Sequence, residues 1–437
     1  MQHSHEGLDR LGGFSRVNLL APLRLRDFRL LWIGMTVSLV GDGIFFVAMA
    51  WQAYELWNAP AALSLIGVGM TVPTIAFLLP AGVLSDRLDR RSLMLCADVG
   101  RAVVIAVLAT LALTGALTFW ELIVVVALYG VGTAFFTPAF EAIVPDIVPA
   151  ADLAAANSLD QFVRPIALRL AGPAVGGALV AGLGAGSAFA VDAASFAAST
   201  LAVFLMRPPA HPRSDHVHSS LSAIKEGLEF VRRRVWLWGT LLSAAIAYLA
   251  FMGPTEVLLP YIVKNDLHAS AGDLGLVFAA GGVGAICAAL IMGQRGHPGR
   301  DVTFMYVTWT LATLAVAGYG LASASWQLMI ACLIFNALEA AGTIVWATIK
   351  QRHVPGSMLG RVSSLDWLIS IGLLPLSFAL TAPVAGLIGA RATLIGAAAI
   401  GGAITLAALF LPGMRDIEGP AEAGEPELLR PRLFVDA

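Results

Sequence analysis

The chain has 437 residues, of which 58% are hydrophobic and 13% are charged, and its mean hydropathy is +0.80. This composition excludes a soluble globular domain and indicates an integral membrane protein. The formal net charge of −2 gives no reason to expect a nucleic-acid partner. The three cysteines are too far apart in the sequence for a disulfide framework or a zinc knuckle.

Twelve apolar stretches are each long enough to cross a bilayer as a helix, which takes about 20 residues. Six lie in the first half of the chain, and six follow a long polar interval. In chain order they cover residues 30–56, 61–84, 92–115, 119–143, 156–182, 187–206, 237–263, 272–292, 302–322, 326–350, 362–388 and 392–411.

The basic residues are distributed unevenly between the two sides of these stretches. With the N-terminus placed in the cytoplasm, 22 of the 27 Lys and Arg residues fall on the cytoplasmic side, counting Lys350 at the cytoplasmic end of the tenth stretch, and only Lys264 and Arg391 fall in the loops on the other side. Membrane proteins keep their basic loops in the cytoplasm. The sequence therefore predicts a multi-pass protein in the lipid bilayer of the cell inner (cytoplasmic) membrane, with both termini cytoplasmic.

The intervals between apolar stretches divide the chain into segments. Apolar residues recur at helical spacing between 221 and 235, which predicts a helix on the membrane surface after a proline-rich start to the central interval. The C-terminal tail is rich in Glu, Pro and Gly, a composition typical of disorder. We expect a cytoplasmic N-terminal segment (1–29), an N-terminal six-helix bundle (30–206), a cytoplasmic linker with the surface helix (207–236), a C-terminal six-helix bundle (237–411) and a disordered cytoplasmic tail (412–437).

The two halves resemble each other at a constant offset of 206 residues, which indicates an internal repeat. Because each repeat has an even number of spans, the halves run parallel, with a cavity between them that can open to either side by rocking. The sequence thus predicts an all-α membrane protein of twelve transmembrane helices in two parallel six-helix repeats. The matching pairs are Leu31-Trp32 with Leu237-Trp238, Val148-Pro149 with Val354-Pro355, and Ser158-Leu159-Asp160 with Ser364-Leu365-Asp366.

A charged loop, residues 82–91, interrupts the apolar pattern between the second and third stretches. Its glycine allows neighbouring helices to approach closely, and its acidic and basic side chains can form ion pairs where the chain turns at the membrane surface. The pattern resembles the cytoplasmic signature loop between helices 2 and 3 of the major facilitator superfamily. The resemblance implies the fold of that superfamily and a cytoplasmic gate formed by Gly82, Asp86, Arg87, Arg90 and Arg91.

A second motif lies inside the fifth stretch, where Gly172-Pro173 is followed by Gly176-Gly177. Proline removes a helix hydrogen bond and bends the axis, while the glycines let a neighbouring helix pack against the bend. Ordinary packing of small residues is the alternative. The pattern resembles the Gly-Pro-x-x-Gly-Gly motif of major facilitator exporters, where it accompanies drug/proton antiport.

A third motif precedes the eleventh stretch, where Pro355 is followed by Gly360-Arg361-Val362. It resembles the corresponding loop in the macrolide-efflux and enterobactin-exporter branch of the drug:proton antiporters. Gly360 and Arg361 are therefore added to the predicted gate, where Asp86 would accept hydrogen bonds from amides at the start of this helix. The sequence departs from the drug:proton antiporters in one respect. Many of them carry an arginine in the middle of helix 4, and residues 128–132 of the fourth stretch contain none.

Asp42 lies near the middle of the first stretch between two glycines. A charged side chain at the bilayer centre costs about 2.5–3.5 kcal/mol on insertion scales, so such residues usually have a function. We predict that Asp42 is the proton or cation site; the alternative is a carboxylate that accepts hydrogen bonds from nearby backbone at a turn loosened by glycine. Asp98 and Arg101 are expected to join the charges at the cytoplasmic side, and Asp192 has no assigned role.

Four more ionisable residues are candidates for the proton or substrate site. Arg164 follows Asp160 by one helical turn, which favours a local ion pair. Arg169 lies near the midplane before the Gly-Pro bend, where it would neutralise the carboxylate of the first stretch or attract an anionic group. Glu339, near the centre of the tenth stretch, and Glu256, in the outer half of the seventh, are expected to line the cavity.

Together with the resemblance, these residues predict a secondary active transporter that exports a small amphipathic molecule, a drug or antibiotic, by proton antiport. The proton gradient would supply the energy, and no cofactor, metal site or catalytic site is expected. The protein is expected to act as a monomer and not as an enzyme. The same residues fit an exporter of an endogenous metabolite such as a siderophore, or a nutrient importer. A non-transporting membrane sensor or scaffold is disfavoured by the gate and bend motifs.

Overall fold

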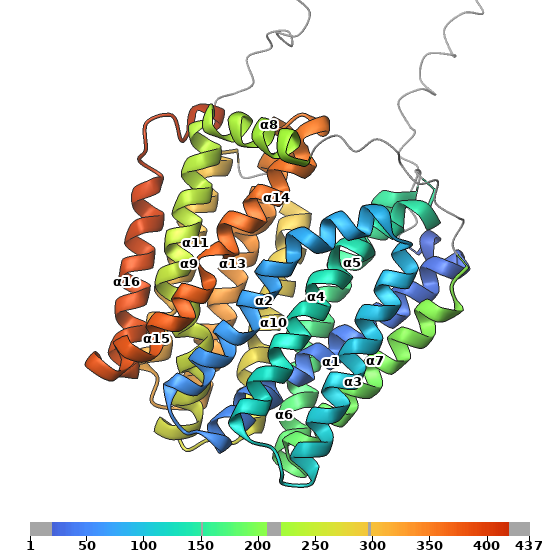
Figure 1. Ribbon diagram of the computed structural model, residues 1–437. Coiled ribbons are helices and arrows are strands. Elements are labelled where there is room, and N and C mark those ends of the chain that lie inside the picture. The colour runs from blue at the N-terminus through green and yellow to red at the C-terminus, as the bar shows by residue number, and fades with distance from the viewer. Residues whose placement is uncertain (1–19, 150–151, 208–219, 296–298, 419–437) are drawn as a thin grey trace, which may run out of the picture.

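The computed structural model describes residues 20–149, 152–207, 220–295 and 299–418 (Figure 1). The predicted proline-rich part of the linker and most of the predicted tail lie outside these residues. The first half consists of η1 (Ala21–Arg24), α1 (Arg26–Leu56), α2 (Pro60–Arg87), α3 (Arg90–Leu113), α4 (Phe119–Ile147), α5 (Leu153–Arg164), the π-helical η3 (Pro165–Ala171), α6 (Gly172–Leu183) and α7 (Ala185–Leu205).

The second half has the same number of membrane-length helices. It consists of α8 (Ser220–Arg232), α9 (Val235–Tyr261), the π-helical η4 (Ile262–Asp266), α10 (Ala271–Arg295), α11 (Asp301–Ala315), α12 (Ala317–Leu321), α13 (Ser325–His353), α14 (Gly356–Gly372), α15 (Leu374–Ile388), α16 (Ala390–Ala408) and η5 (Asp416–Glu418).

Within the described residues, twelve spans are long and apolar enough to cross a membrane. The prediction of an all-α protein with twelve transmembrane helices is therefore confirmed. Four of the spans combine consecutive helices: Ala155–Leu183 covers most of α5 together with η3 and α6, Val235–Asp266 contains α9 and η4, Asp301–Leu321 contains α11 and α12, and Val362–Ile388 covers most of α14 together with α15.

Local sequence signals explain where several helices begin. Asp89 caps α3 by accepting a hydrogen bond from the backbone N–H of Ser92 at 2.9 Å, which satisfies one of the free donors of the first turn. Thr118 and Glu121 form a reciprocal capping box at the start of α4. Pro60 occupies the first position of α2. A backbone N–H at this position has no partner within a helix, so the N–H that proline lacks costs no hydrogen bond.

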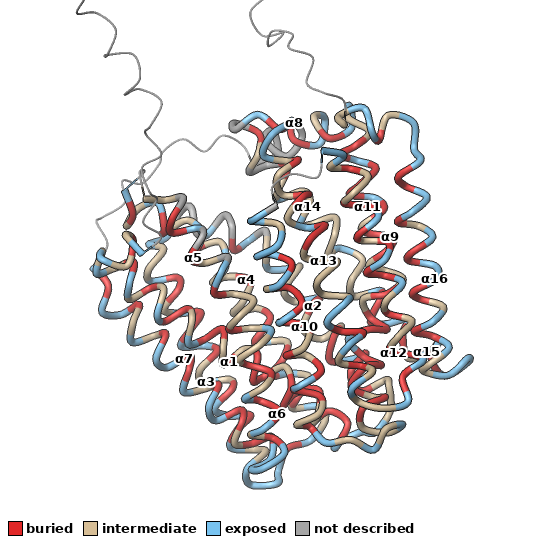
Figure 2. Tube along the Cα trace, turned by 180° about the vertical axis from the view of Figure 1, so that it is seen from behind, coloured by how far each residue is buried: buried red, intermediate tan, exposed pale blue. Residues whose placement is uncertain are grey.

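The outer surface is apolar, as a lipid-facing surface requires. Val99, Val103 and Val107 recur every four residues on α3, so they lie on one face of the helix, and all three are exposed. Large apolar side chains are also exposed along α7 and α16. Figure 2 shows exposed residues along the outward faces of these helices and buried residues inside the bundle. Such a surface is stable in a bilayer and not in water.

The surface helix α8 lies across one end of the second half (Figure 1). The described chain begins and ends at this same end of the molecule, which we call the terminal side; the other end is the opposite side. Helix α1 runs from the terminal side to the opposite side, and so does α9. Residues late in both helices therefore lie near the opposite side.

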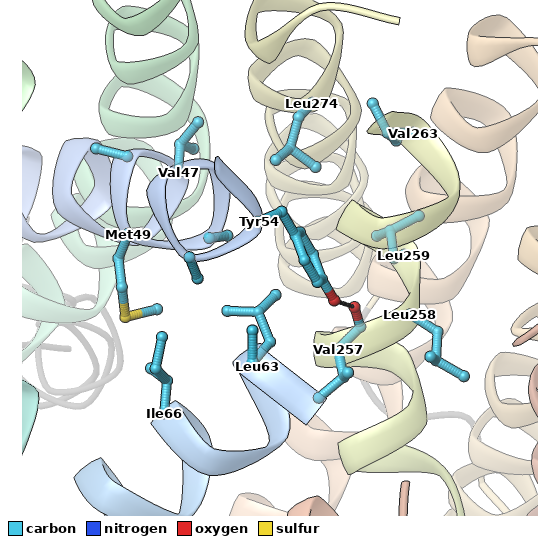
Figure 3. Packing of buried hydrophobic residues seen from close by; sticks show 14 of the residues in the cluster. Val47, Met49, Tyr54, Leu63, Ile66, Val257, Leu258, Leu259, Val263 and Leu274 are labelled. Atoms are coloured by element: carbon cyan, nitrogen blue, oxygen red, sulfur yellow. Dashed lines mark hydrogen bonds between the residues drawn. The ribbon is translucent and has the colours of Figure 1, made fainter. Parts of the chain in front are cut away.

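The two halves are joined at the opposite side. Tyr54, near the end of α1, donates a hydrogen bond to the backbone carbonyl of Val257, near the end of α9, at 2.5 Å. Figure 3 shows this bond beside Leu63 and Leu274. The loop residue Asn58 donates to Asn265 at 2.6 Å. Further contacts join α6 to α10 and α2 to α15.

Glycines permit the closest approach between the halves. A Cβ atom added to Gly177 of α6 would lie 2.9 Å from the Cα of Gly275 in α10 and 2.8 Å from the carbonyl oxygen of Ala271. Distances this short are essentially never seen for real Cβ atoms, so a larger side chain would force the helices apart.

A leucine at Gly177 is therefore expected to weaken the contact at the opposite side. In a background with Cys96, Cys287 and Cys332 replaced by serine, a cysteine introduced at the buried Leu259 near the end of α9 should react several-fold faster with a membrane-impermeant maleimide in the Gly177→Leu variant, because the population shifts toward states with the opposite side open.

The matched control is Gly182→Leu on the same helix, because a Cβ atom there meets nothing within 4 Å. The control should leave the labelling rate unchanged. Equal labelling of all three proteins would show that the glycine contact does not hold this side closed.

Candidate functional site

Asp42 lies in the middle of α1 and accepts a hydrogen bond from the hydroxyl group of Tyr129 in α4. The glycines on either side of it allow close packing of other helices. A Cβ atom at Gly43 would lie 2.8 Å from the carbonyl oxygen of Leu168 in η3, and Gly41 packs against Ser195 of α7. Asp42 thus lies partly buried between α4, α7 and η3, with the Tyr129 side chain as its hydrogen-bond donor.

A buried ion pair lies beside Asp42. Arg101 of α3 donates to Asp98 at 2.5 Å, and the Asp98 and Arg101 side chains are 0% and 5% exposed. Ser199 of α7 donates to the second oxygen of Asp98 at 2.7 Å. Asp98 and Arg101 therefore lie inside the first half, which corrects the prediction that they join the charges at the cytoplasmic side. Asp98 and Arg101 can pair directly because the three-residue spacing places both side chains on one helix face.

The guanidinium group of Arg101 is held by aromatic rings. Its carbon lies 4.6 Å from the ring centre of Phe136 and 4.4 Å from that of Phe196, distances at which a cation is attracted to an aromatic face. Arg101 also acts electrostatically on Asp42 and on Asp192. The positive charge of Arg101 thus attracts three carboxyl groups, those of Asp42, Asp98 and Asp192.

Asp192 of α7 is the third of these carboxyl groups and is fully buried. Its Oδ1 accepts a hydrogen bond from Ser195 at 3.2 Å. Its Oδ2 is buried without a hydrogen-bond partner in the described part of the chain. Asp42 acts electrostatically on Asp192, and both act on Tyr129. We call the buried residues Asp98, Arg101, Tyr129 and Asp192, together with the partly buried Asp42, the buried polar cluster.

The remaining predicted residues of the fifth span do not join this cluster directly. Arg164 donates to Asp160 at 2.8 Å, which is the local pair that the spacing favoured, and it acts on Asp42 only as a more distant charge. Arg169 donates to Asn336 of α13 at 2.8 Å, across the boundary between the halves. It also acts electrostatically on Glu256. The partner of Arg169 is thus in the second half, and the hydrogen-bond partner of Asp42 is Tyr129.

Glu339 lies in α13 and lines a pocket inside the second half. Its carboxylate accepts a hydrogen bond from Thr343 at 2.9 Å. The pocket is formed by α9, α11, α13 and α16 and includes Tyr248, Trp309 and Phe335. These two predicted acidic residues therefore lie in different halves, Asp42 in the first and Glu339 in the second.

Two of the predicted gate residues tie helices together within the first half. Arg90 donates to Asp146 at 2.6 Å and to the carbonyl oxygen of Ala142 at 2.8 Å, which joins α3 to α4. Arg91 donates to the carbonyl oxygen of Val203 at 3.0 Å, which joins α3 to α7. The side chains of the other predicted gate residues lie outside the described part of the structure: Gly82, Asp86, Arg87, Gly360 and Arg361.

The Gly-Pro motif lies directly after the π-helical segment η3. A Cβ atom at Gly172 would lie 2.7 Å from the Cα of Gly43, and one at Gly176 would lie 2.8 Å from the Cα of Ile44. Pro173 is buried at the start of α6. The motif therefore packs α6 tightly against α1 next to Asp42, while Gly177 faces α10 of the second half. Any shift of this span relative to α1 alters the packing around the Asp42 carboxyl group.

Among the described residues, no group of three or more His, Cys, Asp or Glu side chains could hold a metal ion. His216 and His218 lie outside those residues.

The buried polar cluster could be predicted only in part from the sequence. Asp98 and Arg101 stand out as charges in an apolar stretch, but Tyr129 carries no signal that separates it from a packing residue.

Comparison with known proteins decides the family. The family described as transmembrane secretion effector, a branch of the major facilitator superfamily, matches residues 17–428. The chain belongs to this family. The chain is therefore a major facilitator transporter and not an enzyme.

Relatives of this chain include three proteins that are named for export. Multidrug efflux pump Tap of Mycolicibacterium fortuitum is 27% identical over 91% of this chain and 97% of its own length. Macrolide efflux protein A of Streptococcus pyogenes is 25% identical over 83% of this chain and 90% of its own. Enterobactin exporter EntS of Citrobacter koseri is 28% identical over 77% and 80%.

Solved structures of other transporters share the fold of this chain. The nucleoside transporter NupG superposes with a TM-score of 0.67 at 11% identity, covering 90% of this chain and 99% of that chain. An inward-facing bacterial homologue of the iron transporter ferroportin superposes with a TM-score of 0.64 at 16% identity, covering 88% and 98%. At these identities the likeness concerns the fold alone.

Proposed function

We propose that the protein exports a small amphipathic molecule, a drug or antibiotic, in exchange for protons, with Asp42 as the coupling carboxylate. The observation that carries this proposal is the position of Asp42, partly buried in the middle of an apolar helix of the first half with Tyr129 as its hydrogen-bond donor. The names of the efflux and exporter relatives favour export over import. No cofactor is required, since the proton gradient supplies the energy.

Charge balance in the buried polar cluster supports a proton site. Three carboxyl groups face one guanidinium group, and Asp98 already pairs with it. A second and third negative charge in an apolar bundle would each carry a large desolvation penalty. Asp42 and Asp192 are therefore proposed to hold protons in the conformation described here. The loss of a proton from Asp42 would change the balance of charge between α1, α4 and α7.

Alternating access would link this site to transport. The positive-inside rule makes the terminal side cytoplasmic. The contacts of Tyr54 and Asn58 then join the halves on the outer side, which corresponds to a state closed toward the outside. Asp86 is proposed to close the inner side in the other state by accepting amide hydrogen bonds near Gly360. The functional unit is proposed to be a monomer in the inner membrane.

A second cargo class has specific support. The enterobactin exporter among the relatives, together with Arg169 at the boundary between the halves, favours export of an endogenous anionic metabolite such as a siderophore. A nutrient importer would use the same fold but has no such support.

Direction and cargo can be tested in everted membrane vesicles whose interior has been acidified by respiration. Addition of erythromycin, ethidium or enterobactin should raise the internal pH of vesicles that contain the protein, because each exported molecule is exchanged for protons. Vesicles without the protein should not respond. If none of the three compounds releases protons, and intact cells instead accumulate one of them, the importer is favoured and the proposal fails.

A further inference from the structure

The π-helical segment η3 of the fifth span connects the surroundings of Asp42 to the second half. On one side, a Cβ atom at Gly43 of α1 would lie 2.8 Å from the carbonyl oxygen of Leu168. On the other side, a Cβ atom at Gly282 of α10 would lie 2.6 Å from the carbonyl oxygen of Arg169. Two consecutive carbonyl groups of η3 thus pack against helices of different halves, and glycine permits both contacts because it has no Cβ atom.

A side chain of the same segment extends this connection. Arg169 donates a hydrogen bond to the amide oxygen of Asn336 in α13 at 2.8 Å, and the amide nitrogen of Asn336 donates to the backbone carbonyl of Cys332 at 2.9 Å. The same amide lies against α10, where a Cβ atom at Gly281 would be 2.5 Å from its nitrogen. Arg169 also acts electrostatically on Glu256 of α9. The Asn336 amide is thus held in place on the second half, and Arg169 reaches it from the first.

A cation at the start of η3 can respond to the charge of Asp42. The titratable and charged groups that act on Asp42 come from four helices: Asp98 and Arg101 of α3, Tyr129 of α4, Arg164 of α5 and Asp192 of α7. Arg101 is held between two aromatic rings, whereas the side chain of Arg164 is 40% exposed and directly precedes η3. When Asp42 loses its proton, the new negative charge therefore pulls Arg164 and the start of η3 toward α1.

The π-helical geometry of η3 allows this pull to act at a distance. Such turns are rare, and most occur as single turns inside α-helices, often at functional sites. η3 interrupts the fifth span in this way between α5 and α6. If one turn takes up α-helical hydrogen bonding, the residues beyond it move by about one position, which is about 1.5 Å along the axis and roughly 100° around it. A movement of this size carries the Arg169 guanidinium group away from Asn336.

We propose that η3 transmits the protonation state of Asp42 to the second half, with the hydrogen bond between Arg169 and Asn336 as the link that changes. With Asp42 protonated, η3 is π-helical and the link is formed, as in the structure. Loss of the proton changes the hydrogen bonding of η3 and releases the link. Arg169 and Asn336 are thus positioning residues. The proposal rests on the proposed export function and names the residues that connect its proton site to the movement of the halves.

Distances between spin labels on the two halves test this proposal. The labels are attached to cysteines that replace the exposed Ala116 and Leu387 at the opposite side, in the full-length protein without native cysteines, reconstituted in nanodiscs. With no further change, the population with the longer distance should rise several-fold from acidic to alkaline pH as Asp42 loses its proton. Arg169→Leu should show the larger population at every pH, whereas Arg169→Lys should keep most of the pH dependence because lysine can still donate to Asn336.

A double variant tests whether the link acts after the proton site. Asp42→Asn should show the distances of the acidic state at every pH, because asparagine has the shape of a protonated aspartate. Asp42→Asn/Arg169→Leu should instead show the open population of Arg169→Leu. If the double variant keeps the distances of Asp42→Asn, η3 does not act between Asp42 and the second half, and the proposal fails.

The packing of η3 can also be broken without removing a charge. Gly282→Leu should give the open population of Arg169→Leu, because its side chain pushes the carbonyl group of Arg169 away from α10. Gly293→Leu is the matched control on α10, where a Cβ atom meets nothing within 4 Å. Arg233→Leu is the control for a lost arginine, because that side chain is 73% exposed on α8. Both controls should keep the pH profile of the parent protein, with size-exclusion profiles and melting temperatures that match across all variants.

Distances that do not change with pH in the parent protein, or an unaltered pH profile in Arg169→Leu, would overturn the proposal. The labels report conformation and need no cargo. A pH-dependent distance that Arg169→Leu abolishes, in a protein that exchanges no cargo for protons, would therefore reject the antiport and leave the role of η3 standing.

Discussion

The Asp42→Asn variant is expected to lose proton-driven transport and to retain exchange of cargo down its own gradient. Asparagine has the shape of a protonated aspartate and can still accept the hydrogen bond from Tyr129, but it cannot release a proton. The helices around it should therefore pack as in the protonated wild type. Uphill accumulation of ethidium in vesicles should fall to background, while counterflow of ethidium between equal-pH compartments should persist.

The pH dependence of counterflow provides a second test of the Asp42→Asn variant. Counterflow by the wild type should change with pH because Asp42 gains and loses a proton, whereas counterflow by Asp42→Asn should be flat. Asp266→Asn is the matched control, because Asp266 forms an exposed pair with Arg391 at 2.7 Å away from the buried polar cluster. Proton-driven accumulation at wild-type levels in Asp42→Asn would reject Asp42 as the coupling residue.

Loss of the Arg101 side chain is expected to have the largest effect on stability. Arg101→Leu leaves Asp98 buried and unpaired in the first half, and breaking one partner of a buried pair costs about 3–5 kcal/mol. The variant should give little folded protein, with a melting temperature far below that of the wild type. Size-exclusion chromatography of detergent extracts and thermal melts measure both effects.

A double variant separates charge from packing. In Asp98→Asn/Arg101→Gln both partners are neutral, and Ser199 can still donate to the residue at position 98. The double variant should therefore be more stable than Arg101→Leu, because no uncompensated charge stays buried. If the double variant is no better than the single one, the packing of Arg101 between Phe136 and Phe196 dominates and the electrostatic account of the pair is wrong.

The arrangement of spans could be predicted from the sequence because the bilayer imposes it. A helix needs about 20 apolar residues to cross the bilayer, so the number of spans follows from the apolar stretches themselves.

The fifth span differs from its prediction in its local structure. The stretch 156–182 gave a prediction of one bent helix, but the structure contains a π-helical segment at Pro165–Ala171 before the Gly-Pro motif. Pro165 and Pro173 mark the two ends of this irregularity in the sequence.

The partners within the site could not be predicted in the same way. Transmembrane helices are apolar on all sides, so the sequence does not show which face of a helix meets which neighbour. Asp42 stands out because a lone carboxylate in an apolar stretch is costly. Its donor Tyr129 lies 87 positions away on α4, and the rotation of both helices about their axes decides that they meet. The contact between Arg169 and Asn336 depends in the same way on how the two halves dock.

Exchange of cargo against protons by the purified protein is the most direct test of this account. In liposomes that contain the protein, a pH gradient with an acidic interior is imposed as the sole energy source, and ethidium accumulation inside is followed by fluorescence. The account predicts accumulation that stops when the ionophore nigericin removes the pH gradient, and no accumulation with Asp42→Asn. Accumulation that is unaffected by nigericin, or equal in both proteins, would contradict proton coupling through Asp42.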